Sequence, residues 1–134
     1  MLVKRRITVK AVVTEEYKER LVTQLKQALG KVELSLQELE LQGRRYLTEL
    51  VDGDPARTTA FRERLERQIG RQRQIRESLA GRLAVVRELE TGTEHTHAVL
   101  DGFADVSVGD NLAKKLEAAE IVMKDDVVVE IRHA

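Results

Sequence analysis

Arginine is the residue of this chain best suited to chemistry. Six of the sixteen residues from Phe61 to Arg76 are arginine, in the run FRERLERQIGRQRQIR. A guanidinium keeps its charge at all ordinary pH values and binds phosphate or carboxylate oxygens through paired hydrogen bonds. Residues 55–90 hold nine arginines and five glutamates, so this segment has a surplus of positive charge. The run is either a surface that binds the phosphates of RNA or the ion-paired, solvated face of a helix.

Ion pairs account for part of the run. If Phe61 and Ile75 occupy the same heptad position, Arg62 and Arg76 flank a seam where glutamates of a facing helix can meet them. Three pairs have the i,i+4 spacing of ion pairs within one helix: Arg62–Glu66, Glu63–Arg67 and Arg73–Glu77. Aromatic side chains interleaved with the arginines, on which bases could stack, are absent. The run itself therefore favours the solvated face, and phosphate binding is the alternative.

Five arginines near a predicted turn are the candidate partner-binding residues: Arg44, Arg45, Arg57, Arg62 and Arg64. They lie within about three helical turns of the loop near residues 52–55. A partner protein or RNA at this tip is one interpretation, and a solvated loop is the other.

Other catalytic or ligand-binding chemistry has little support in the sequence. The chain has no cysteine, no phosphate-binding or dinucleotide-binding glycine motif, and no pairing of a nucleophile with a base. His95 and His97 would share one face of a strand, but a zinc site needs a third ligand, and the spacing of Asp101 or His133 does not demand one. We therefore expect no catalytic residue, no metal and no cofactor.

Two long helices are predicted to present these arginines. Thr14 followed by Glu15 and Glu16 is typical of a helix start. The seam that follows has alternating spacings of three and four residues, with Gly43 as its one flaw: Val22, Leu25, Leu29, Val32, Leu36, Leu39, Gly43, Tyr46 and Leu50. A second helix starts at Pro55 and ends near Gly92, so the two have about equal length. Equal lengths predict an antiparallel hairpin in which Tyr46 faces Phe61 and Leu39 faces Leu65.

Both ends of the chain show the two-residue period of strands. Ile7, Val9 and Ala11 alternate with more polar residues, and residues 121–132 indicate a hairpin about Asp125-Asp126. Gly102 indicates a bulge. The predicted fold is α+β: a long antiparallel coiled-coil hairpin, residues 15–90, inserted into a small antiparallel sheet, residues 1–14 and 91–134.

Segments at both ends of the chain also resemble the YlqD family of small bacterial proteins. The similar segments are residues 7–16 (ITVKAVVTEE), residues 106–110 (VSVGD) and residues 120–132 (EIVMKDDVVVEIR). The family usually has Asp-Gly where this chain has Asp125-Asp126. The resemblance implies no established activity. In some bacteria the family's genes lie among those for ribosome assembly and tRNA modification, which favours the RNA or ribosome interpretation only modestly.

These observations favour a non-enzymatic binding or assembly protein that self-associates, chaperone-like or a scaffold. Leu34 and Leu41 lie on the outer helix face, with Leu47 nearby, and are the candidate self-association residues, while the sheet edges would be covered by a partner subunit. The alternative is an RNA- or ribosome-associated factor that uses the arginines. No apolar run approaches the roughly 18 residues of a membrane span, and Lys10 interrupts the only candidate leader, so a cytoplasmic protein is expected.

Overall fold

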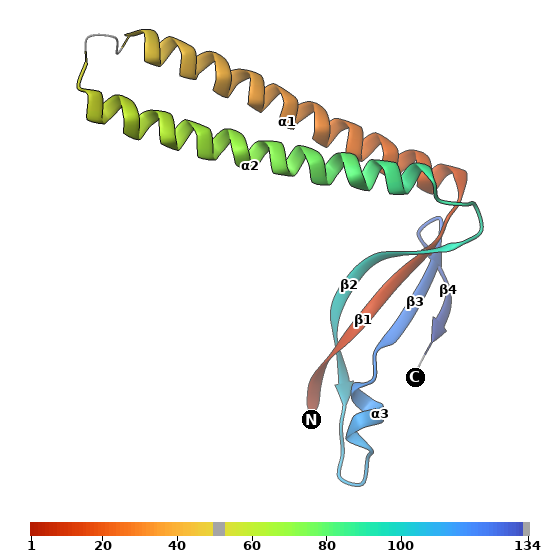
Figure 1. The fold of residues 1–134 in the computed structure, drawn as a ribbon. Helices are drawn as coiled ribbons and strands as arrows, with labels where there is room; N and C mark the ends of the chain where they lie inside the picture. The colour runs from red at the N-terminus through yellow and green to blue at the C-terminus, as the bar shows by residue number, and fades with distance from the viewer. Residues whose placement is uncertain (50–52, 133–134) are drawn as a thin grey trace. The chain divides into compact units, whose positions relative to one another are not determined.

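The computed structural model describes residues 1–49 and 53–132. Its elements follow one another as β1 (Leu2–Val12), α1 (Glu15–Glu49), α2 (Pro55–Arg87), β2 (Glu94–Asp105), α3 (Leu112–Leu116), β3 (Ala119–Lys124) and β4 (Val127–Arg132) (Figure 1). The chain folds into two compact units, a sheet unit of Met1–Glu19 with Leu89–Ala134 and a helical unit of Arg20–Glu88. Two long helices and a four-stranded sheet built from both chain ends make the fold α+β, as predicted. The predicted seam residue Leu50 and part of the predicted tip lie outside the described residues.

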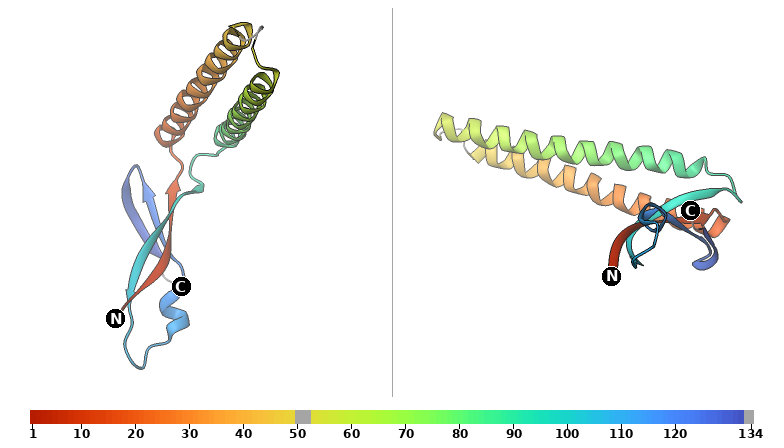
Figure 2. Two further views of the ribbon diagram at one scale, coloured as in Figure 1. Left: turned by 90° about the vertical axis from the view of Figure 1, so that its left-hand side faces the viewer. Right: turned by 90° about the horizontal axis from the view of Figure 1, so that it is seen from below.

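The two long helices begin at the capping residues that the sequence indicates. The Thr14 hydroxyl accepts a hydrogen bond from the backbone N–H of Tyr17 at 3.1 Å, and Asp54 accepts one from Ala56 at 3.0 Å. These bonds satisfy N–H groups that have no partner in the first turn of a helix. Figure 2 shows the helices lying side by side. The rings of Tyr46 and Phe61 are 3.9 Å apart, which confirms the predicted facing pair.

Gly43 allows a close contact between the two helices and is not a flaw in their pairing. It is buried, and a Cβ atom at this position would collide with the side chain of Leu65. Leu65, which was predicted to face Leu39, fills the space that the glycine leaves. The missing side chain on α1 therefore accommodates a large one on α2.

The buried stripe of α2 also differs from the prediction. Ile75 was assigned to the seam but is exposed, whereas Leu83, which was not assigned, is buried. Gln72 and Arg76 are half-buried. The cause is helical geometry, because positions three and four apart from Leu65 onward reach Gln72 and Arg76 before they reach Leu83.

The sheet is mixed, and the prediction of an antiparallel sheet was wrong. Its strand order is β2-β1-β3-β4, with β1 antiparallel to β2 and parallel to β3, and β3 antiparallel to β4. β2 runs back along one side of β1 and ends opposite Leu2. The chain then passes through α3 and returns on the other side of β1, where Ala119 pairs with Ile7 (Figure 1). A strand that starts there has to run in the same direction as β1.

The strand hairpin at the C-terminal end is confirmed, but the bulge lies elsewhere than predicted. Asp125 and Asp126 have φ angles of 49° and 67°, which are the left-handed values of a tight two-residue hairpin turn. Gly102 pairs regularly with Arg5, and it leaves room for the side chain of Ile7, which a Cβ atom would meet. The register of β1 with β2 shifts instead where Val9 pairs with Ala98 and Lys10 with Thr96.

Candidate partner-binding surfaces

The five candidate arginines of the helical unit, Arg44, Arg45, Arg57, Arg62 and Arg64, are all exposed. The contact of Tyr46 with Phe61 fixes how the two helices are aligned. The contact of Gly43 with Leu65 lies about one turn farther from the loop that joins them. Arg44 and Arg45 lie between these contacts on α1, as do Arg62 and Arg64 on α2. The structure therefore brings four of the five arginines to one level of the hairpin, and Arg57 lies nearer the start of α2.

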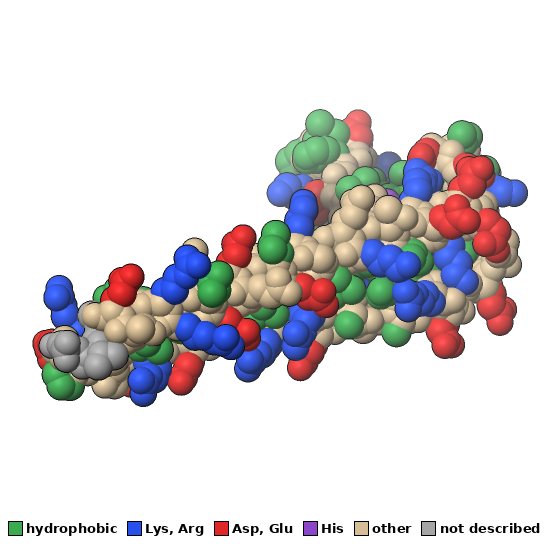
Figure 3. All heavy atoms as spheres, turned by 90° about the horizontal axis from the view of Figure 1, so that it is seen from above, with side chains coloured by type: hydrophobic (Ala, Val, Ile, Leu, Met, Phe, Trp, Pro, Cys, Tyr) green, Lys and Arg blue, Asp and Glu red, His purple; other side chains and the backbone are tan. Residues whose placement is uncertain are grey.

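Ion pairs neutralise fewer of these arginines than the sequence suggests. None of the three predicted i,i+4 pairs of α2 forms an ion pair between its described residues. Arg73 instead pairs across the hairpin with Glu40 at 3.7 Å. On the face seen in Figure 3, basic and acidic side chains are interspersed along the helices without forming a continuous patch of one sign. Within the described residues, the four arginines around Tyr46 and Phe61 have no carboxylate partner.

An aromatic side chain lies among these arginines, which was not predicted from the sequence. Tyr46 is 40% exposed and contacts Phe61, so a ring from α1 stands beside arginines of both helices. The arginine run contains no interleaved aromatic, because the tyrosine is contributed by the other helix. The predicted pairing of Tyr46 with Phe61 was the signal that could have revealed it.

The predicted leucine surface is smaller than expected. Leu34 and Leu41 are exposed on α1, but Leu47 is half-buried. The cause is the helix period, since Leu47 follows Leu41 by six residues and so turns toward the buried side.

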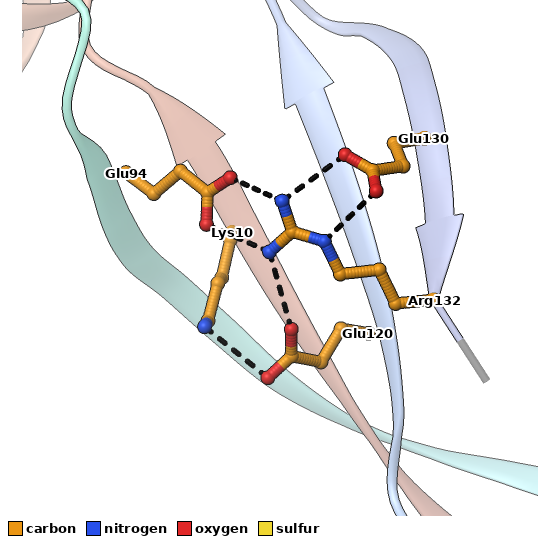
Figure 4. Close-up of polar contacts among 5 residues, drawn as sticks. All are labelled: Lys10, Glu94, Glu120, Glu130 and Arg132. Carbon is orange, nitrogen blue, oxygen red and sulfur yellow. Dashed lines mark hydrogen bonds and ion pairs between the residues drawn. The ribbon is translucent and has the colours of Figure 1, made fainter. Parts of the chain in front are cut away.

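One face of the sheet carries a network of charges (Figure 4). The Arg132 guanidinium of β4 donates to both carboxylate oxygens of Glu94 on β2, at 2.9 and 2.6 Å, and to both of Glu130, each at 3.0 Å. Glu120 of β3 lies 3.5 Å from the same guanidinium and 3.2 Å from the ammonium of Lys10 on β1. This charge network therefore joins side chains of all four strands.

The charge network shifts the protonation of two members. The hydrogen bond from Arg132 lowers the pKa of Glu94 below its ordinary value of 4.5, and the charges of Arg132 and Lys10 act in the same direction. The hydrogen bonds to Glu94 and Glu130 raise the pKa of Arg132. Both groups stay charged at neutral pH, so the network holds strands together rather than exchanging protons.

The opposite face of the sheet is apolar and partly open. Val9 pairs with Ala98 on one side and with Ile121 on the other, and Ile121 pairs with Ile131, so these four form one row across the sheet. Ile131 is 58% exposed. In the adjoining rows Leu100 is 50% and Val128 is 55% exposed. This surface was not predicted from the sequence, although the run Val127-Val-Val in β4 departs from simple alternation.

A comparison with protein families identifies the chain. The family model described as YlqD protein matches residues 1–132. The chain belongs to the YlqD family. A crystal structure of a protein of unknown function from Synechococcus sp. WH 8102 is 26% identical, with a TM-score of 0.87, and the match covers 99% of this chain and 95% of that chain. A comparison with curated proteins gave no match.

The two histidines of this YlqD-family protein contact a buried tyrosine. The hydroxyl of Tyr17 lies 3.0 Å from Nδ1 of His97, and its ring is 6.4 Å from the ring of His95. Among the described residues, no three histidine or acidic side chains gather closely enough to hold a metal ion, and His133 lies outside them. The described helices include none with the length and apolar character of a membrane span.

Proposed function

We propose that this YlqD-family protein is a non-enzymatic binding and assembly protein of the cytoplasm that self-associates through its sheet unit. The observation that carries the proposal is the open apolar surface of the sheet, where Leu100, Val128 and Ile131 are each at least half exposed. A sheet normally buries its apolar face against a second layer. Within the sheet unit, α3 contacts β1 and β2, and its five residues are too few to form such a layer.

The free energy available from this surface is substantial. Full burial of a large aliphatic side chain is worth about 1.5–3 kcal/mol, so burial of the exposed half of each of these three is worth about 1 kcal/mol. Two copies contribute six such side chains, or roughly 6 kcal/mol by the same rule. The exposed Leu34 and Leu41 offer a second, smaller apolar contact on the helical unit.

In this proposal the helices form an antiparallel coiled coil whose tip contacts a protein partner, as in a scaffold or a chaperone-like assembly. The support is the pair of contacts between the helices, Tyr46 with Phe61 and Gly43 with Leu65, together with exposed arginines near the tip. Arginine and tyrosine are both enriched among the residues that contribute most to protein interfaces, so exposed guanidinium groups next to an aromatic ring suit a binding surface.

Sedimentation velocity tests the self-association. At micromolar concentration we expect a dimer or larger species that dissociates on dilution. A sedimentation coefficient of the monomer at all micromolar concentrations would contradict the proposal.

A second candidate function is the binding of single-stranded RNA at the helical unit, and Tyr46 favours it. A half-exposed aromatic ring beside exposed arginines combines a stacking surface with phosphate ligands. Affinity for a labelled single-stranded RNA should then fall steeply as salt is raised, because phosphate contacts release counterions.

A matched pair of variants tests RNA binding at this position. The double variant Arg45→Ala/Arg62→Ala removes one charge from each helix beside Tyr46, and Lys26→Ala/Arg82→Ala removes one exposed charge from each helix far from it. Loss of two phosphate contacts should reduce the salt slope by roughly 1.4 for a single strand. Equal effects of the two double variants, or binding that ignores salt, would rule out a site at Tyr46.

A further inference from the structure

We propose that a second copy of this chain docks face to face on the apolar face of the sheet, so that two sheets form a sandwich. The apolar face is the row of Ala98, Val9, Ile121 and Ile131, together with Leu100 and Val128 in the adjoining rows. Val9 is buried at its centre, and Leu100, Val128 and Ile131 on the outer strands are its exposed members. This inference rests on the proposed self-association and specifies the surface that performs it.

The apolar face has clear boundaries. By strand alternation Arg5 also points to this side, but it lies beyond Ile7, in a row that β3 and β4 do not reach. At the other end, the buried Tyr17 stands close to the ring of His95, which pairs with Ala11. Between these limits the paired rows contain no charged residue. All five members of the charge network lie on the opposite side.

The strand edges are poor sites for a second copy. β2 and β4 are the outer strands, and each contains a register irregularity. In β2 the extra residue is His97, because its neighbours Ala98 and Thr96 pair with consecutive residues of β1. In β4 the extra residue is Val129, because its neighbours Glu130 and Val128 pair with consecutive residues of β3. Bulges of this kind disturb the ladder and discourage edge-to-edge pairing. We expected a partner subunit to cover the edges, and the two bulges favour the face instead.

A second copy is the occupant that matches this surface. A face without charges gives a partner no ion pair, so its complement is another uncharged face of similar extent. The same face on a second chain meets this requirement, and one two-fold axis covers both copies at once and closes the assembly. Two sheets packed in this way bury their apolar faces and leave both charge networks toward solvent.

Charge substitutions on the two faces of the same strands test the inference. Leu100→Glu/Ile131→Glu places carboxylates on the apolar face, one on β2 and one on β4. The control Val99→Glu/Val127→Glu makes the same change on the same two strands but on the other face, at residues that are 55% and 64% exposed. We expect the first variant to raise the dimer dissociation constant in sedimentation experiments by at least about tenfold, and the control by less than about twofold.

The outcomes separate this inference from the proposed function. If the wild type is a monomer, both fail. If the wild type dimerises and the two double variants behave alike, self-association stands and the apolar face is not its surface.

Thiol labelling gives a second measurement that does not depend on whether Leu100→Glu/Ile131→Glu folds. The chain has no cysteine, so Ile131→Cys and Val127→Cys each introduce a single reactive thiol on opposite faces of β4. Raising the protein concentration through the dimerisation range should slow alkylation at position 131 and leave position 127 unchanged. Equal rates at both positions, at every concentration, would overturn the face-to-face arrangement.

Discussion

Replacement of Gly43 by alanine should weaken the helical unit, although alanine favours helices. In an exposed helix interior, glycine to alanine stabilises by about 1 kcal/mol. At Gly43 the added Cβ atom meets Leu65, and overpacking of this kind costs about 1–3 kcal/mol. The two terms leave Gly43→Ala destabilised by roughly 0–2 kcal/mol.

Gly70 supplies the matched control on the neighbouring helix. A Cβ atom at Gly70 has no atom within 4 Å, so Gly70→Ala should gain the full helical preference of about 1 kcal/mol. The two variants should therefore differ by roughly 1–3 kcal/mol in the free energy of unfolding. Urea unfolding followed by circular dichroism at the helical band measures this difference, because α1 and α2 supply most of the helical signal.

A second substitution identifies the cause. In a Leu65→Ala background the colliding side chain is gone, so Gly43→Ala should become stabilising by about 1 kcal/mol, as at Gly70. If Gly43→Ala stabilises the wild type as much as Gly70→Ala does, the end of the Leu65 side chain moves aside without cost, and the reasoning that overpacking weakens the helical unit is wrong.

Two further predictions concern the charge network and the start of α2. Because Arg132 lowers the pKa of Glu94 in the folded state, Glu94 adds stability above pH 4.5 that is lost as the pH falls through the folded pKa. The urea concentration at the midpoint of unfolding should therefore fall less steeply with decreasing pH in Glu94→Gln than in the wild type. An equal slope in the two proteins would contradict this. Arg132 has a raised pKa and stays charged throughout, so it does not contribute to that slope. Asp54→Ala should lower the free energy of unfolding by about 1 kcal/mol because it removes the acceptor for Ala56, whereas Asp54→Asn should change little; equal losses would exclude capping as the cause.

The helices could be predicted from the sequence because helical periodicity is a local property. The spacing of three and four residues, the cap at Thr14 and the turn before Pro55 each involve neighbours along the chain. Even there, hydrophobicity alone misplaced part of the seam. Ile75 is apolar and exposed, while Arg76 is charged and half-buried, because burial follows position on the helix and a long side chain can bury its stem.

The arrangement of the sheet could not be predicted in the same way. Alternation in residues 7–13 indicates a strand but does not say which strand pairs with it or on which side. The parallel pairing of β1 with β3 depends on the path of the chain through α3, which no local pattern records. The aromatic neighbour of the arginines was missed for a related reason, because Tyr46 and Phe61 meet only when the hairpin closes.

The two faces of the sheet have opposite consequences for assembly. The charge network satisfies its own members, since Arg132 already contacts three carboxylates, and a partner on that face would have to break those contacts or bury them. The apolar face has no such internal partner, and Leu100, Val128 and Ile131 gain free energy from any apolar cover. Association should therefore be insensitive to salt at the sheet and sensitive to salt at the arginines beside Tyr46. A dimer whose dissociation constant rises strongly with salt would place its contacts on charged residues instead of the apolar face.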